Sequence, residues 1–580
     1  MGIATVAVYS DADRHAMHAQ LADEAVHIGP AKASESYLDM ERILAAAKQT
    51  CAEAIHPGYG FLSENSEFAR RCKKAGVVFI GPSPESMDAM ASKSAAKTLM
   101  EKAGVPVTPG YHSDDQSLKK LEAEARRIGF PLMIKATAGG GGKGMRVVHV
   151  EKEFEDALDG ARREAKNAFG DERVLLEKYI RQPRHIEFQI FGDSHGNVVH
   201  LFERECSLQR RFQKVVEETP SPFLDDTTRK QMGEAAVAAA KAVNYVNAGT
   251  IEFIVGADRA FHFMEMNTRL QVEHPITEEI TGLDLVEWQL RVASGERLPI
   301  TIQDGISING HAIEVRVYAE NTAKDFLPVT GRVDAFEYPT EGVHFRLDTG
   351  IGSGDEISIF YDPMIAKLSV WDADRHSAIH QLRSALARTA IFGMVTNLPL
   401  LRGIANHPEF SDGKFDTGFI ERNLTNLLAR PRLSPYALAT AIADELTTRF
   451  YNSAGPWQAD GWRPDGKRGV RFVAHAMDGT EHSVVAYPAS DGVTLDIDGK
   501  TQAFSTSRFD GHTWDVDGYT ASILSYGNDR QVDLDDEAFN FVLTSPFAPQ
   551  SARVADTATH PVSPMPGRVV AVHVKVGDNV

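Results

Sequence analysis

Apolar and polar positions in the first part of the chain predict short strands that alternate with helices. The strand-like runs lie at residues 4–9, 54–55 and 77–80, and the helix-like stretches lie at 37–48 and 67–75. Strands that alternate with helices are typical of a parallel α/β layer, so we expect one such layer in residues 1–90.

A second pattern pairs two apolar runs, 131–134 and 146–150, around four consecutive glycines, Gly139–Gly142, with Lys135 at the end of the first run. Glycine lets successive backbone N–H groups curve around phosphate oxygens, and the lysine adds a positive charge. No Gly-Lys-Ser/Thr here leads into a helix, so the pattern favours a phosphate-binding hairpin over a P-loop. A plain flexible turn is the alternative.

A third pattern follows the apolar run 260–264. Polar groups then recur at every second position: Glu265, Asn267, Arg269, Gln271 and Glu273. Alternate side chains of a strand share a face, so this spacing predicts that all five converge on one side of an extended segment. The alternative is a solvated strand face with alternating charges.

These residue types suit defined chemistry. Oxygens of Glu265 and Asn267, with Glu252 from the strand-like run 250–255, are ligands for a hard cation. Arg269 can bind a small planar oxyanion through two hydrogen bonds, and Glu273 can accept a proton.

The pattern changes beyond residue 430. Asp-Gly pairs separate short alternating runs, which is a strong hairpin signal, so we expect a small antiparallel β domain over residues 430–545. Residues 546–561 are rich in proline and small side chains and are typical of a linker. The six Asp-Gly pairs begin at Asp465, Asp478, Asp491, Asp498, Asp510 and Asp517.

Length, net charge and cysteine count argue against several classes of protein. The chain has 580 residues, which predicts several hydrophobic cores. Its net charge of −19 argues against nucleic acid or an anionic membrane as the main partner. The three cysteines are too few for a disulfide or zinc framework. No apolar run reaches the ~18 residues of a membrane span, and the first residues lack a secretory signal.

The glycine hairpin, the two carboxylates and the run Glu-Met-Asn-Thr-Arg-Leu-Gln-Val-Glu-His-Pro at 265–275 together resemble the ATP-grasp domain of biotin-dependent carboxylases. The resemblance covers residues 1 to about 425. It implies an α/β fold with a pre-ATP-grasp and an ATP-grasp domain and a carboxylase C-terminal domain, followed by the small antiparallel β domain. Other matching segments are 56–65, 177–179, 183–189, 204–211, 213–218 and 361–367.

The resemblance also implies domain boundaries. The expected N-terminal domain is 1–90, lacking its first strand, and the ATP-grasp domain is 91–302, with a mobile lid at about 107–180. The carboxylase C-terminal domain is then 303–425, the β-rich subunit-docking domain 430–545, and the linker 546–561. Residues 562–580 resemble the start of a biotinyl carrier domain, which we expect to be incomplete because the biotin-accepting Glu-Ala-Met-Lys-Met turn does not occur.

Roles follow from the resemblance residue by residue. It implies three groups of binding residues. For ATP these are Lys93, Lys135, Gly141, Gly142, Glu177, Ile180, His185 and Gln209; for magnesium or manganese they are Glu252, Glu265 and Asn267; for bicarbonate and biotin they are Lys214, Arg269, Gln271, Val272, Arg316 and Tyr59. The implied catalytic residues are Glu273, as the base for bicarbonate, Arg316, which stabilises the biotin enolate, Arg269 and Lys214. Phe212 departs from the histidine of several relatives, so one nucleotide contact is expected to be lost.

The implied activity is ATP-dependent carboxylation of biotin, carried on a lysine absent from this chain, with bicarbonate. The expected partners are a carrier domain and the carboxyltransferase β subunit of an acyl-CoA carboxylase, in a hetero-oligomer. The resemblance is greatest to 3-methylcrotonyl-CoA carboxylase α subunits, and propionyl-CoA and geranyl-CoA carboxylases are the alternatives. The expected location is the bacterial cytoplasm or the mitochondrial matrix.

Two other classes stay open. A carboxylate–amine ligase with an ATP-grasp fold would explain the hairpin and the metal carboxylates, although not the row from Arg269 to Glu273. Relatives begin with a further strand and helix, and the biotin-accepting turn does not occur, so we expect a chain shortened at both ends. The second alternative is therefore a catalytically impaired fragment that serves only as an assembly scaffold.

Overall fold

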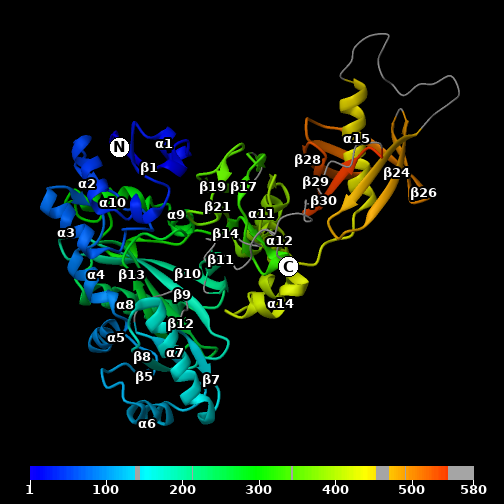
Figure 1. Cartoon of the computed structure of the whole chain (residues 1–580). Coiled ribbons are helices and arrows are strands. Elements are labelled where there is room, and N and C mark those ends of the chain that lie inside the picture. Colours follow the sequence, from blue (N-terminus) through cyan, green and yellow to red (C-terminus); the bar gives the residue numbers. More distant parts are fainter. Residues whose placement is uncertain (138–143, 212, 341–343, 452–468, 490, 547–580) are drawn as a thin grey trace, which may run out of the picture.

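The computed structural model describes residues 1–137, 144–211, 213–340, 344–451, 469–489 and 491–546. Figure 1 shows a large α/β body, a lid that projects from it, and a separate β barrel near the C-terminal end. The predicted linker and the predicted start of a carrier domain lie almost entirely outside the described residues.

The N-terminal part confirms the predicted alternation of strands and helices. β1 (Val6–Ser10) pairs in parallel with β2 (Glu24–Gly29), and β3 (Ala54–Ile55) pairs in parallel with β4 (Val78–Phe79). The two pairs form separate two-stranded sheets instead of one layer. The predicted helices are α2 (Met40–Gln49) and α3 (Ser66–Ala75), and β2 was not predicted.

An eight-stranded antiparallel sheet forms the centre of the body. In spatial order its strands are β13 (Phe261–Asn267), β12 (Asn247–Val255), β9 (Arg184–Gly192), β10 (Val198–Arg210), β11 (Gln213–Thr219), β14 (His311–Tyr318), β21 (Met364–Asp372) and β19 (Phe345–Thr349). The sheet therefore runs without a break from the expected ATP-grasp domain into the expected C-terminal domain.

Helices cover both faces of this sheet. Ile313 and Val315 of β14 pack with buried residues of α11 (Arg375–Ala387). Ala312, on the opposite face of the same strand, packs with Ile276 and Ile280 of α9 (His274–Thr281). The face under α9 consequently also carries the alternate side chains of β14, which include charged ones. Other helices of the body are α4 (Pro84–Ala91), α5 (Lys93–Lys102), α8 (Asp226–Ala242), α10 (Leu285–Ala293), α12 (Leu398–Asn406) and α14 (Phe419–Leu427).

The lid has a sheet and a core of its own. Its strands, in spatial order, are β5 (Gly110–Tyr111), β8 (Val174–Lys178), β6 (Leu132–Ala136) and β7 (Arg146–Val148), and its helices are α6 (Leu118–Ile128) and α7 (Phe154–Phe169). β6 and β7 pair antiparallel, as the prediction of a hairpin requires. Gly139–Gly142 lie between them, outside the described residues.

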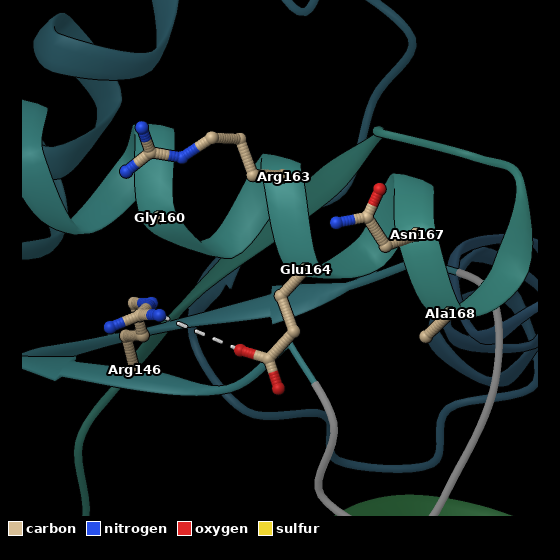
Figure 2. Close-up of a pocket in the computed structure, with 6 residues that line it drawn as sticks. All are labelled: Arg146, Gly160, Arg163, Glu164, Asn167 and Ala168. Carbon is tan, nitrogen blue, oxygen red and sulfur yellow. Dashed lines mark ion pairs between the residues drawn. The ribbon is translucent and has the colours of Figure 1, made fainter. Parts of the chain in front are cut away.

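A shallow hollow of about 570 Å³ lies on this lid, between β7 and α7. Figure 2 shows Arg146 from β7 directed toward Glu164 of α7, at 3.6 Å. None of the expected site residues lines this hollow, so it is separate from the predicted site. Its lining residues are Arg146, Gly160, Arg163, Glu164, Asn167 and Ala168.

The predicted β domain is a closed antiparallel barrel. Its strands are β23 (Val470–Ala476), β24 (Glu481–Ala489), β25 (Gly492–Ile497), β26 (Lys500–Arg508), β27 (Thr513–Val516), β28 (Tyr519–Tyr526), β29 (Asp529–Leu534) and β30 (Glu537–Thr544). The hairpin prediction is confirmed at Asp498-Gly499 and Asp517-Gly518, where both residues of each pair have positive φ as type I′ turns require.

The prediction of the β domain is confirmed, but it did not include the helix that lies inside this barrel. α15 (Pro435–Tyr451) contributes seven buried residues, including Ala437 and Ile442, to one core with the inward-facing residues of the strands. Residues 437–443 are buried all around, so they lack the one-sided apolar stripe by which a sequence reveals a surface helix.

Shortening a buried side chain of this helix should destabilise the barrel. Ile442 is fully buried, so we expect Ile442→Ala to lower the free energy of unfolding of the barrel by about 2–5 kcal/mol. Hydrogen exchange of β23–β30 measures the change. Thr448→Ala, on an exposed position of the same helix, is the matched control, and equal exchange in the two variants would contradict the buried placement.

No helix among the described residues is both long enough and apolar enough to cross a bilayer.

Candidate active site

The hairpin of β12 and β13 brings the expected metal ligands together. Glu252 and Glu265 are direct partners across the two strands. Asn267 Nδ2 donates a hydrogen bond to Glu252 Oε1 at 2.7 Å. Two carboxylates and an amide oxygen form a donor set that fits a hard divalent cation.

The structure corrects the predicted row of five residues on one strand. β13 ends at Asn267, and Arg269, Gln271 and Glu273 lie in a loop that leads into α9. The chain leaves the sheet there because Leu270 enters a core with Trp288, and Pro275 favours the first turn of α9.

The loop nevertheless returns two of these side chains to the same place. Gln271 Nε2 donates to Glu252 Oε1 at 3.3 Å, and Glu273 occupies the N-cap position of α9, where it is 2% exposed. Arg269 lies at the edge, with its Nε 3.4 Å from Glu64 Oε2 and its Nη2 3.5 Å from Asn267 Oδ1.

Lys214 lies at the centre of a buried cluster of carboxylates. Its Nζ is 2.5 Å from Glu187 Oε2, 2.6 Å from Glu273 Oε1 and 3.3 Å from Glu252 Oε1. A bulge in β11 allows this contact, because the register with β10 shifts by one extra residue between Val216 and Lys214. The shift places Lys214 on the face that carries the site.

Arg316 completes the charged centre from β14. Its Nη2 is 2.8 Å from Glu273 Oε2 and 2.5 Å from Glu217 Oε1. Burial alone would raise the pKa of Glu273, but Lys214, Arg316 and then Arg204 outweigh burial and hold that pKa well below its usual range. Glu273 is therefore ionised at neutral pH, although the lowered pKa makes it a weaker base than a solvent-exposed carboxylate.

A third cation lies beside this centre. Lys367 of β21 donates to the backbone oxygen of Val272 and lies 5.7 Å from the ring centroid of Tyr59. Tyr59 is 39% exposed, so the expected biotin neighbour lines an open side of the site. Lys367 stands in one of the segments that matched the family, yet its place in the site was not predicted.

Arg204 is a second residue that the prediction missed. It is fully buried, and its guanidinium donates to Glu187 at 2.6 Å and to Gln271 at 3.0 Å. Further bonds to Gln189, Thr250 and Thr277 tie β9, β12 and α9 together. No periodicity identifies such a residue, because a buried arginine in a strand resembles an exposed one in sequence.

The expected nucleotide residues lie between the body and the lid. Lys93 Nζ of α5 is 3.5 Å from Glu265 Oε2, and Lys135 Nζ of β6 is 2.6 Å from Glu177 Oε2. Burial, and then the charge of Lys93, lower the pKa of Lys135 to about 8. His185 Nε2 lies 2.9 Å from Glu252 Oε2, next to the expected metal ligands.

The remaining expected residues have simple placements. Gln209 lies on β10 opposite Lys214, and Ile180 follows the end of β8. Gly141, Gly142 and Phe212 lie outside the described residues.

Lys97 lies beside the expected nucleotide residues Lys93 and Lys135, and the prediction missed it. It is 3% exposed, lies one turn after Lys93 on α5, and contacts Glu177 from the side opposite Lys135. Because Lys97 belongs to the body and Glu177 to the lid strand β8, this contact joins the base of the lid to the body. Burial, and then the charges of Lys135 and Lys93, hold the pKa of Lys97 well below its usual value.

Removing the Lys97 amine, the contact of Glu177 on the body, should weaken nucleotide binding. We expect Lys97→Met to raise the Kd for ATP by about tenfold, because Glu177 then competes for Lys135, and hydrogen bonds to charged groups contribute ~1.5–3 kcal/mol. Equilibrium binding of an ATP analogue measures the effect. Lys102→Met, on the exposed end of α5, is the control; unchanged affinity in Lys97→Met would contradict the assignment.

Family models match three consecutive segments of the chain. "Biotin carboxylase, N-terminal domain" matches residues 1–87, "Carbamoyl-phosphate synthase L chain, ATP binding domain" matches 92–301, and "Biotin carboxylase C-terminal domain" matches 314–422.

Curated relatives match over the whole chain. The mitochondrial methylcrotonoyl-CoA carboxylase subunit alpha of Dictyostelium discoideum is 46% identical over 603 residues, which cover 100% of this chain and 86% of the relative. The propionyl-CoA carboxylase alpha chain of Ruegeria pomeroyi is 42% identical over 618 residues, which cover 100% of this chain and 90% of the relative.

Solved structures match the body. The biotin carboxylase domain of Hydrogenobacter thermophilus 2-oxoglutarate carboxylase, solved with MgADP, ADP and bicarbonate, has a TM-score of 0.71 at 44% identity and covers 74% of this chain and 94% of its own. Biotin carboxylase from Campylobacter jejuni, in a β-γ-ATP complex, has a TM-score of 0.70 at 45% identity, covering 73% and 94%.

Proposed function

The chain belongs to the biotin carboxylase family, and from this premise we propose that it is a ligase that carboxylates biotin with bicarbonate and ATP. The observation that carries the proposal is the joint contact of Lys214 and Arg316 with Glu273, beside the Glu252, Glu265 and Asn267 oxygens. This arrangement offers a base, two cations and a cation-binding set within one site.

We propose the following roles for the nucleotide side. Lys93, Lys135, Gly141 and Gly142 bind the phosphates of ATP, while Glu177, Ile180, His185 and Gln209 surround the nucleoside. A magnesium or manganese ion held by Glu252, Glu265 and Asn267 would neutralise charge on the phosphates during transfer.

On the bicarbonate side, Lys214, Arg269, Gln271 and the backbone of Val272 would orient the anion. Glu273 would take its proton while the hydroxyl-derived oxygen attacks the γ-phosphate of ATP, which releases ADP and forms carboxyphosphate. The cations that lower the pKa of Glu273 also stabilise the doubly charged carbonate, so proton transfer between the two stays feasible.

On the biotin side, carboxyphosphate would break into carbon dioxide and phosphate, and this phosphate would take the proton from N1′ of biotin. Arg316 would stabilise the enolate oxygen that forms, while N1′ of biotin captures the carbon dioxide. Tyr59 and Lys367 would line the entrance, since Lys367 contacts the Val272 backbone oxygen and Tyr59 lies next to Lys367.

Whole-chain relatives support the role of an α subunit in an acyl-CoA carboxylase that works with a carboxyltransferase β subunit. We propose a methylcrotonoyl-type enzyme in a hetero-oligomer, because the relative of that type is 46% identical and the propionyl-type relative 42%. Propionyl-CoA remains the second candidate. The carrier domain that presents biotin, and a location in the bacterial cytoplasm or the mitochondrial matrix, belong to the same proposal.

We also propose that the expected boundaries at residues 90, 302 and 425 divide the chain by role, and that the barrel over 430–545 docks the β subunit. The division at 302 separates roles within one sheet, since β14, β19 and β21 continue the sheet of β9–β13.

Release of phosphate from ATP, measured on the full chain with bicarbonate and free biotin, tests the proposal. We expect ATP cleavage that requires bicarbonate, is slow without biotin, and becomes faster when biotin is added. Cleavage that instead depends on an added amine or carboxylate would point to another ATP-grasp ligase. Absence of cleavage together with binding of a carboxyltransferase β subunit would support a scaffold.

A further inference from the structure

Two carboxylates lie side by side beneath the proposed site. Glu217 of β11 and Glu314 of β14 are direct partners across the antiparallel strands, and both are fully buried. Cβ atoms of such partners are about 4.5–5.5 Å apart, so the two side chains share one space under α9.

Hydrogen bonding leaves these carboxylates incomplete. Among the described residues, Glu217 Oε2 and Glu314 Oε1 have no hydrogen-bond donor, and Glu217 Oε1 has only the ion pair with Arg316. Arg316 Nη2 makes an ion pair with Glu217 at 2.5 Å, and Ser369 Oγ donates to Glu314 Oε2 at 2.9 Å. A proton on one carboxyl group would supply the missing donor to the other.

The charges around the pair decide its ionisation. Burial, and secondarily the neighbouring carboxylates, raise the pKa of Glu217 to about 7 and that of Glu314 to about 8, against the opposing effect of Arg316 and Lys367. Two carboxylates this close ionise in two coupled steps. The titratable groups that interact with the pair are Lys214 on β11, Cys206 on β10, Arg316 and Tyr318 on β14, Lys367 on β21, and Glu273 at the start of α9.

We propose that Glu217 and Glu314 hold one proton between them at neutral pH and thereby keep the positive charge of Arg316 available to biotin. This inference rests on the proposed function, in which Arg316 meets the biotin oxygen. With both carboxylates ionised, Glu217 and Glu273 would both pair with Arg316, and the charge of Glu314 would add to theirs, while Lys214 and Lys367 would offset part of this negative charge. With one proton retained, and Glu273 neutralised by the proton from bicarbonate, Arg316 keeps its charge for the enolate.

The two glutamates act differently in this arrangement. Glu217 makes an ion pair with Arg316 and positions its guanidinium, while Glu314 sets the charge of Glu217 and makes no ion pair or hydrogen bond with Arg316 in the described part of the chain. Both are positioning residues, because neither reaches a substrate.

Isosteric amides separate the two roles. Glu314→Gln copies the protonated carboxyl, so we expect biotin carboxylation within about threefold of wild type near pH 7. Wild type should lose this activity between about pH 7 and 9, as the pair loses its last proton, whereas Glu314→Gln should not. Glu217→Gln removes the buried partner of Arg316 and should slow biotin carboxylation about tenfold, with bicarbonate-dependent ATP cleavage without biotin unchanged.

Several results would overturn the inference. An alkaline loss in Glu314→Gln equal to that of wild type would do so, as would equal damage to both reactions in Glu217→Gln. If wild type shows no ATP cleavage that responds to bicarbonate and biotin, the proposed function itself is refuted. This result differs from the results above, in which an active enzyme refutes only the shared proton.

Infrared spectroscopy provides a readout that needs no activity and no folded glutamine variant. The pair should give a protonated-carboxyl band that persists near pH 7 and disappears by about pH 9. Asp533 contributes a similar signal, because burial raises its pKa to about 7, so the spectra are taken in an Asp533→Asn background. Absence of any such band near pH 7 would refute the shared proton.

Discussion

Replacing Arg316 by alanine should reduce biotin carboxylation by roughly 100- to 1,000-fold, the usual effect of removing one group that stabilises a developing oxyanion. The guanidinium is buried between Glu273 and Glu217, and biotin would present its enolate oxygen to the same nitrogen-bearing edge. ATP binding should persist, because no described member of the proposed nucleotide set makes an ion pair or hydrogen bond with Arg316. Initial rates with free biotin, together with equilibrium binding of an ATP analogue, measure the two effects separately.

The variant requires a stability control. Removing one partner from buried ion pairs costs about 3–5 kcal/mol, so Arg316→Ala is compared with wild type by thermal unfolding, and assays are run where both are folded. Arg316→Lys keeps the charge without the planar donor pair and should recover only part of the activity. A loss of nucleotide affinity as large as the loss of biotin carboxylation would show that Arg316 does not act on biotin.

Replacing Glu273 by glutamine should lower bicarbonate-dependent ATP cleavage by roughly 100- to 10,000-fold, the range attributed to a general base. Glutamine fills the same volume at the N-cap of α9 but cannot accept the proton of bicarbonate. Lys214 keeps Glu187 and Glu252 as partners, so the cluster should remain folded. Phosphate release with saturating bicarbonate, without biotin, isolates this step.

Glu296→Gln is the matched control for this substitution, because Glu296 is an exposed partner of Arg291 after α10. It should leave the rate within about twofold, as expected for a surface ion pair. ATP cleavage at the wild-type rate in Glu273→Gln would assign the proton to another acceptor.

The sequence supported the prediction of those parts of the site and of the fold that depend on residues close together along the chain. The glycine hairpin, the partnership of Glu252 with Glu265, and the Asp-Gly turns of the barrel each depend on local backbone geometry. The convergence of Gln271 and Glu273 was predicted for the wrong reason, since a loop and not a strand brings them back.

Other parts depend on contacts between distant segments and left no local signal. The bulge that turns Lys214 toward Glu273 is a property of how β10 and β11 pair. Lys97 and Lys367 look like ordinary solvated lysines until α5 and β21 are placed beside the lid and the loop at Val272. α15 was missed because a helix enclosed by a barrel is apolar on every side.

The unbroken central sheet has a consequence for the lifetime of the intermediate. β12 and β13 would hold the residues for phosphoryl transfer, and β14 and β21 would hold the residues for carboxylation of biotin. All four strands belong to one hydrogen-bonded sheet. Carboxyphosphate is a mixed anhydride that water destroys, so any hinge between the two ends would let it decay unused. A shared sheet removes that hinge and holds the site that forms carboxyphosphate at a fixed distance from the site where biotin accepts the carboxyl group. Efficient coupling of ATP cleavage to biotin carboxylation would then follow from this fixed distance and would not require a timed domain movement.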